Sequence, residues 1–208
     1  MRLAILLCGH VRSWNPHYFK QMFGQVDVYV VTYTKTRGYH PYTLQQYRIE
    51  HNEETTTHED IDRLLEGIPK KRLILEDVPI DDTNCPIHGD TFSQYRTFKQ
   101  CLDLCLKNGT YDVLIKTRFD ITFNRNLEYI LSHITDPSKI YISGGPSVQP
   151  CDQLFCGTPV AMKELANKLV DMNGELPAVK YSPHQWVERQ SGNLVVIPEL
   201  ETYIIRGN

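Results

Sequence analysis

Two apolar segments near the N-terminus constrain the fold more than any other feature of the sequence. Leu3 to Cys8 and Val26 to Thr32 are dominated by aliphatic and β-branched residues, and Trp14 to Phe23 between them can form a short helix. Strands buried on both faces give such nearly continuous apolar runs, and they are typical of parallel sheets covered by helices. The sequence therefore predicts a β-α-β unit at the start of the chain.

The same alternation continues downstream. Caps and apolar periodicity predict helices that open at Thr57 and at a capping Thr91, a short helix near Leu127 to Ile134, and further helices that begin at Thr158-Pro159 and Ser182-Pro183. The further predicted strands are Leu73 to Glu76, after a solvated Lys70-Lys71-Arg72 loop, and Val113 to Phe123, Ile140 to Ser143 and Leu194 to Ile197. About six strands in this order indicate an α/β fold, with a mixed, largely parallel sheet flanked by helices.

Composition limits the class of protein. The chain has 208 residues, of which 41% are apolar, and this length suits one domain spanning 1–208. A net charge of -3 gives no bulk attraction to nucleic acid or to an acidic membrane. No apolar run approaches the ~20 residues that cross a bilayer, and the first strand lacks the cleavage site of a signal peptide. We expect a cytoplasmic protein with reduced, mostly buried cysteines, no membrane partner and a monomeric state.

Residues at the strand ends are the first candidates for function, because ligands of parallel sheets bind at the carboxyl ends of the strands. The first strand ends in Gly9 and His10, with Arg12 close behind, and the second ends at Tyr33. Glycine allows close approach of a ligand and arginine can pair with phosphate; the alternative for this segment is an ordinary strand-to-helix turn. Tyrosine can stack on a base or pack against a helix. The patterns G-x-G-x-x-G and G-x-x-x-x-G-K are absent, which argues against dinucleotide and P-loop sites.

The segment Lys116 to Asp120 carries the strongest candidate residues. Strand alternation places Lys116, Arg118 and Asp120 on one face and apolar residues on the other. A carboxylate at a strand end can hold Mn²⁺ or Mg²⁺ that bridges a diphosphate, and Arg118 can neutralise the same diphosphate. The alternative is a structural pair between Arg118 and Asp120.

Two further residues are candidates downstream. Asp152 is the single acid of an apolar segment, where it can act as a general base or stabilise a sugar cation; the alternative is a buried capping role. His184 begins a predicted helix and is a candidate metal ligand, or else an exposed histidine. The pair Asp60 and Asp62 lies in a predicted helix, where the two carboxylates point to different sides and do not share a metal.

Taken together, these motifs resemble a known family. The ordered segments Gly-His-Val-Arg-Ser after the first strand, Ser93-Gln94-Tyr95, Tyr111 to Asp120 and Asp152 to Phe155 are similar to those of small GT-A glycosyltransferases of bacteria and large DNA viruses. Within the family, the similarity is greatest to the N-terminal glycosyltransferase domains of chlorella virus proteins that help to build capsid glycans. It spans nearly the whole chain, and it would suit a first domain of a longer protein.

The resemblance implies an enzyme that moves a hexosyl or deoxyhexosyl unit, of glucose or rhamnose type, from a nucleotide-diphosphate sugar to a glycan acceptor such as a viral capsid glycan. It implies a UDP-sugar or dTDP-sugar donor, with UDP favoured, a Mn²⁺ or Mg²⁺ ion, and a host-cytoplasmic location if the chain is viral. Asp120 matches the last acid of the family's Asp-x-Asp motif, but Arg118 replaces the first. A sugar nucleotidyltransferase and a non-catalytic sugar- or protein-binding module are the alternatives.

Overall fold

The computed structural model describes residues 1–11, 16–24, 26–34, 56–75, 87, 89–144, 150–171 and 180–204. Arg12, a predicted ligand-binding residue, lies outside these ranges. The described strands are β1 (Leu3–Cys8), β2 (Asp27–Tyr33), β3 (Lys70–Leu75), β4 (Val113–Thr117), β5 (Ile121–Phe123), β6 (Ile140–Gly144), β7 (Pro150–Gly157), β8 (Leu194–Ile197) and β9 (Thr202–Ile204). The described helices are α1 (Pro16–Phe23), α2 (His58–Leu64), α3 (Gly89–Asn108), α4 (Leu127–Ser132), α5 (Pro159–Val170) and α6 (Pro183–Gln190).

Seven of these strands form one mixed sheet in the order β3-β2-β1-β4-β7-β6-β8. Neighbours pair in parallel except at β7, which runs antiparallel to both β4 and β6. The remaining strands, β5 and β9, form a separate antiparallel pair. The α/β class and the mixed, largely parallel sheet flanked by helices are therefore confirmed.

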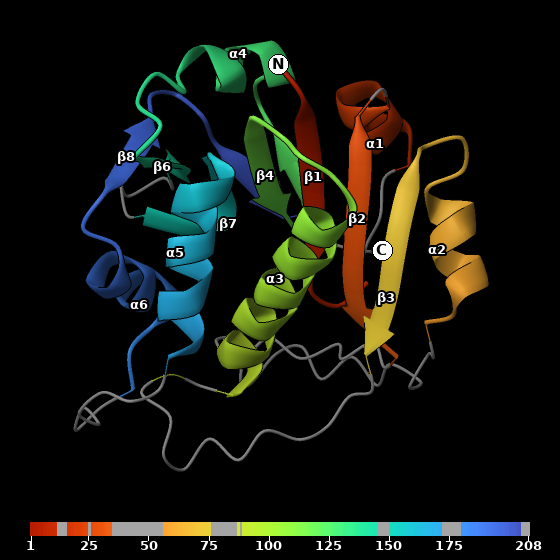
Figure 1. Cartoon of the computed structure of the whole chain (residues 1–208), viewed down its shortest axis with the longest axis horizontal. Coiled ribbons are helices and arrows are strands. Elements are labelled where there is room, and N and C mark those ends of the chain that lie inside the picture. The colour runs from red at the N-terminus through yellow and green to blue at the C-terminus, as the bar shows by residue number, and fades with distance from the viewer. Residues whose placement is uncertain are drawn as a thin grey trace.

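Helices cover both faces of this sheet, as the apolar strands require. On β1, the side chains of Ala4, Leu6 and Cys8 belong to one buried cluster with residues of α3, α5 and α6. Helices α3 and α5 lie in front of the sheet in Figure 1. The alternate residues Ile5 and Leu7 belong to a second cluster with α1, α2 and α4. Side chains of a strand point alternately to its two faces, so a strand covered on both sides is apolar throughout.

Several predicted boundaries are wrong. The run Lys70-Lys71-Arg72 is not a loop but the first half of β3, where Lys70 and Arg72 pair with Asp62 of α2. Helix α3 begins at Gly89, ahead of the predicted cap at Thr91. The predicted strand Val113 to Phe123 is broken by a turn after Thr117, and the sequence reading missed β7 and β9 altogether.

The predicted starts of three helices are confirmed. Thr57 caps α2 through a capping box with Asp60, and Thr158 and Ser182 cap α5 and α6. The Asp60 carboxylate accepts a hydrogen bond in this cap, and the Asp62 carboxylate pairs with Arg72 of β3. The two acids of the helix therefore do not form a metal pair. Within the described part of the chain, no helix has both the length and the apolar character needed to cross a bilayer.

Candidate functional site

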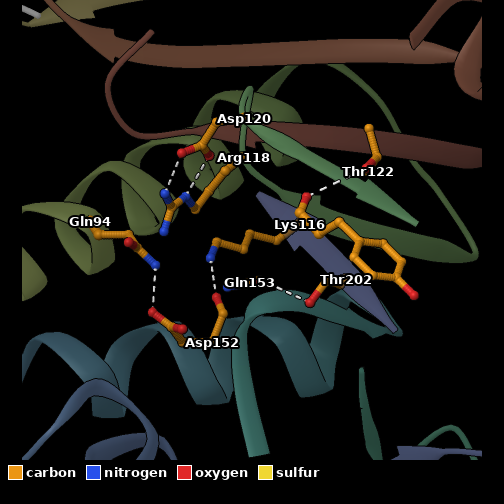
Figure 2. Close-up of polar contacts among 9 residues, drawn as sticks. Gln94, Lys116, Arg118, Asp120, Thr122, Asp152, Gln153 and Thr202 are labelled. Carbon is orange, nitrogen blue, oxygen red and sulfur yellow. Dashed lines mark hydrogen bonds and ion pairs between the residues drawn. The ribbon is translucent and has the colours of Figure 1, made fainter. Parts of the chain in front are cut away.

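Lys116 is the most unusual residue of the central sheet, because it is a fully buried lysine in an apolar strand. It lies on the face of β4 that packs against α3 and α5. Its Nζ donates a hydrogen bond of 2.6 Å to the backbone oxygen of Asp152 and lies 4.7 Å from the centroid of the Phe155 ring. A buried ammonium group is tolerated only where such contacts replace its hydration. Lys116 thus joins the end of β4 to the beginning of β7 (Figure 2).

The carboxylate of Asp152 lies between side chains of two helices. Gln94 of α3 donates from Nε2 to Oδ2 at 3.0 Å, and His184 Nδ1 of α6 lies 3.9 Å from Oδ1. This Nδ1 is buried and has no hydrogen-bond partner among the described residues, although the His184 side chain is 38% exposed. Asp152 itself is 6% exposed. The imidazole of His184 therefore has its buried nitrogen on the side of Asp152, while the rest of the ring is partly exposed to solvent.

An irregularity in β7 explains why Asp152 faces these helices. Leu154 and Cys156 pack into the cluster of α1, α2 and α4, so strict alternation would send Asp152 to the same side. Between Phe155 and Pro150, however, β7 takes five residue steps where β6 takes two, from Ile142 to Gly144. Bulges of this kind re-aim side chains and are frequent beside active sites. Here the bulge directs the carboxylate of Asp152 toward α3.

Arg118 and Asp120 form a bidentate ion pair in the turn after β4. Nε of Arg118 donates to Oδ1 at 2.9 Å, and Nη2 donates to Oδ2 at 2.5 Å. The Asp120 side chain is 4% exposed and that of Arg118 is 17% exposed. Fork-to-fork geometry of this kind is the strongest form of arginine–carboxylate contact. Figure 2 shows both oxygens of Asp120 facing the guanidinium.

The ends of β1 and β2 meet beside this cluster. Gly9 has φ of +104°, a conformation that other residues rarely adopt, and space is open where a side chain would stand. The rings of His10 and Tyr33 lie 4.9 Å apart. Tyr33 is 3% exposed, and its hydroxyl donates to the backbone oxygen of Ser93 in α3 at 3.0 Å. This geometry fits the packing alternative for Tyr33 and leaves His10 as the more accessible ring.

The described residues do not fit a resident Mn²⁺ or Mg²⁺ ion. These ions require several oxygen ligands, about six for Mg²⁺. Both oxygens of Asp120 are engaged by Arg118, and His184 lies against Asp152 instead of Asp120. Across the ranges given above, no three His, Cys, Asp or Glu side chains group closely enough to hold a metal. The predicted metal therefore stays a prediction, for which these residues do not supply the ligand set.

Two residues of this cluster, Gln94 and Lys116, were not predicted from the sequence as site residues. Gln94 appeared only as part of a motif, and Lys116 only as a residue of the polar face of its strand. The signal for Lys116 was a lysine directly after the apolar residues Val113 to Ile115, in a strand buried on both faces. Nothing local marked Gln94, because its contact with Asp152 joins residues 58 positions apart.

A cavity of about 590 Å³ lies elsewhere, between the end of α1 and the start of α4. Two polar side chains that line this cavity make structural contacts: Asn126 caps α4, and Arg125 pairs with Glu199. It lies beside the N-terminus of β2, at the opposite edge of the parallel strands. We therefore assign the candidate site to the cluster at the carboxyl edge, where ligands of such sheets bind.

The cluster combines a buried acid, Asp152, that is held by Gln94 with two cationic side chains, Lys116 at the end of β4 and Arg118 in the turn after it. Such a set can accept a proton, or stabilise a cation, next to a group that binds an anion. Comparison with known proteins adds no assignment to this chemistry: no protein-family model matches the chain, and no curated protein is significantly similar to it.

Proposed function

We propose that this protein is a glycosyltransferase of the GT-A type. It transfers a hexosyl or deoxyhexosyl unit, of glucose or rhamnose type, from a nucleotide-diphosphate sugar to a glycan acceptor. UDP is the favoured nucleotide, and a viral capsid glycan is the acceptor that the sequence resemblance implies. The observation that carries the proposal is that Asp152, Lys116 and the Arg118–Asp120 pair lie together at the carboxyl edge of the sheet (Figure 2).

Three features support this proposal over a purely structural role. The single antiparallel strand makes the sheet mixed, as the GT-A resemblance requires. The bulge in β7 turns the only acid of that segment toward α3, at the cost of regular pairing. Lys116 is buried in a position where an aliphatic residue would pack at lower cost. Irregular strands and buried charges that a regular core does not need are typical of functional sites.

In the proposed reaction the donor lies over the ends of β1, β2 and β4. Backbone groups near Gly9, the ring of His10 and the guanidinium of Arg118 bind its nucleotide and diphosphate. An acceptor hydroxyl attacks the anomeric carbon, and the bond from this carbon to the diphosphate oxygen breaks, with its electron pair leaving on the nucleoside diphosphate. If configuration inverts, Asp152 takes the proton of the attacking hydroxyl; if it is retained, Asp152 faces the anomeric carbon.

Gln94 and Lys116 serve Asp152 in this scheme without touching the substrate. Gln94 fixes one carboxylate oxygen, Oδ2, at 3.0 Å and leaves Oδ1 on the side of His184. Lys116 fixes the backbone of the same residue. A base whose position is set by two neighbours loses little freedom on reaching the reactive geometry, and this lowers the barrier.

A screen of nucleotide sugars tests the proposal directly. Thermal stabilisation and donor hydrolysis are measured with UDP-glucose, UDP-rhamnose and dTDP-rhamnose, for the unmodified protein and for Asp152→Asn. The matched control is Asp103→Asn, an exposed acid of α3 that pairs with Lys99 of the same helix. We expect a donor that stabilises all three proteins and is hydrolysed by the unmodified protein and the control, but about 10²-fold more slowly by Asp152→Asn.

The alternatives give different results in the same screen. A nucleotidyltransferase releases pyrophosphate from nucleoside triphosphate plus sugar phosphate, and it normally needs a glycine-rich basic loop after β1, which the segment from Gly9 does not provide. A non-catalytic sugar-binding module is stabilised by free sugars and ignores the nucleotide. Stabilisation by no nucleotide sugar and no nucleotide would refute the proposal.

A further inference from the structure

The family resemblance implies a metal ion at Asp120, yet the arrangement of the Arg118–Asp120 pair is that of a binding site for an anion. The acid is the deeper member of the pair, with 4% of its side chain exposed, and the arginine is the shallower, with 17% exposed. Both carboxylate oxygens face the guanidinium (Figure 2). A ligand arriving from solvent therefore meets the guanidinium before the carboxylate.

The charges around the pair also disfavour a divalent cation. Lys116 of β4 and Arg118 of the turn that follows carry two positive charges, which offset the negative charges of Asp120 and Asp152. These four side chains have no surplus negative charge with which to attract a dication, and the two cations repel it. To reach Asp120, a metal would also have to displace both hydrogen bonds from Arg118.

We propose that Arg118, oriented by Asp120, takes the place of the metal ion: its guanidinium binds the donor's diphosphate, and the site binds nucleotide without a divalent cation. This inference rests on the proposed function. A guanidinium is planar, keeps its charge at all working pH values and matches phosphate oxygens in a fork geometry. Asp120 acts as a positioning residue, because it fixes the orientation of the guanidinium before the ligand arrives and so reduces the entropy lost on binding.

The two schemes predict opposite rankings for substitutions at the same two residues. If Asp120 is a metal ligand, Asp120→Asn is the severe change, and it removes any effect of Mn²⁺ on binding. If Arg118 is the diphosphate ligand, Arg118→Gln is the severe change. Asp120→Asn then weakens binding less, because the amide still accepts one hydrogen bond from Arg118 and the local charge becomes more positive.

The test is calorimetric titration of the full chain with UDP and, separately, with dTDP, in EDTA and in Mn²⁺. We expect the same dissociation constant within about twofold in both conditions for the unmodified protein. Arg118→Gln is expected to weaken binding by about tenfold or more, the effect of losing a charge-assisted contact. The matched control is Arg63→Gln, an exposed arginine of α2 with a surface partner in Asp60.

Because Arg118→Gln leaves a buried carboxylate without its partner, the double variant Arg118→Gln/Asp120→Asn is measured as well. It removes both charges together and should fold, and it too should bind UDP about tenfold more weakly. Two outcomes would overturn the inference and leave the proposed function standing. In the first, UDP binds only when Mn²⁺ is present. In the second, Asp120→Asn abolishes binding and the double variant shows no further loss. Failure of both nucleotides to bind in either buffer overturns the inference and the proposed function together.

Discussion

The Arg118–Asp120 pair makes a prediction about stability that is independent of any ligand. The carboxylate is almost fully buried and the guanidinium mostly so. Removing one partner of a fully buried pair costs about 3–5 kcal/mol, because the other charge stays buried without compensation. Since Arg118 retains some contact with solvent, we expect the lower end of that range, about 3 kcal/mol, for Asp120→Asn or Arg118→Gln alone.

A double-mutant cycle isolates the interaction between the two side chains. We expect the double variant to lose no more stability than either single change, which corresponds to a coupling energy of about 3 kcal/mol. The internal control is the pair of Lys99 and Asp103, which has a similar contact of 2.8 Å but side chains that are 30% and 52% exposed. An exposed pair on a helix is worth about 0.3–0.5 kcal/mol.

Urea unfolding at neutral pH measures these energies, and thermal unfolding provides a second reading. In a chain of this size, 1 kcal/mol shifts the midpoint by about 2–4 °C, so a single change at the buried pair should lower it by roughly 6–12 °C. A coupling energy no larger than that of the Lys99–Asp103 control would refute the reasoning. It would mean that Arg118 does not hold Asp120 in solution and that the carboxylate is open to a metal.

Three further predictions follow from the geometry. Gln94→Leu removes the hydrogen bond to Asp152 Oδ2. We expect the turnover number with the identified donor to fall about tenfold while nucleotide affinity is retained, and an unchanged turnover number would exclude a positioning role for Gln94. Burial raises the pKa of the Cys105 thiol to about 12, and Cys101 is buried as well. Iodoacetamide should therefore modify both thiols only after unfolding, as measured by peptide mass spectrometry, and rapid labelling of the native protein would contradict their burial. Gly9→Ala forces a side chain into φ of +104° without any clash; a loss of about 1–2 kcal/mol in urea unfolding is expected, and no loss would mean that the turn relaxes.

The layered fold could be predicted because the apolar pattern and the caps are local signals. Leu3 to Cys8 is apolar at every position because helices cover both faces, and Thr158-Pro159 opens a helix in the sequence as in the structure. Lys70 and Arg72 misled the prediction because β3 is an edge strand. Charged side chains are tolerated there, and both pair with Asp62 of α2.

The break between β4 and β5 could not be predicted from periodicity. Phe119, Ile121 and Phe123 continue the apolar alternation of the strand and are buried in the same cluster as Ile115, although a turn intervenes. Strand β7 escaped prediction for another reason. Asp152 and Gln153 interrupt its apolar pattern, and its partners in β4 lie about 40 positions away, where no local signal connects them.

The candidate site was predicted in part. The rule that ligands gather at strand ends singled out Arg118 and Asp120, and the pairing of these two was one of the alternatives weighed. The sequence also singled out Asp152 and His184, and the structure brings them within 3.9 Å of each other. Their partnership could not be foreseen, because it depends on a strand that was missed and on an irregularity within it.

The bulge of β7 has a consequence for how this fold can change over time. Phe155 and Cys156 are tied into the sheet by regular pairing with both β4 and β6, whereas the residues between Pro150 and Phe155 run through the irregular stretch. Losing or gaining one residue ahead of Leu154 would present a different side chain to α3 while the interior of the protein stayed as it is. At this position of the sheet, the side chain that faces the candidate site can therefore change without any change in the packing of the core.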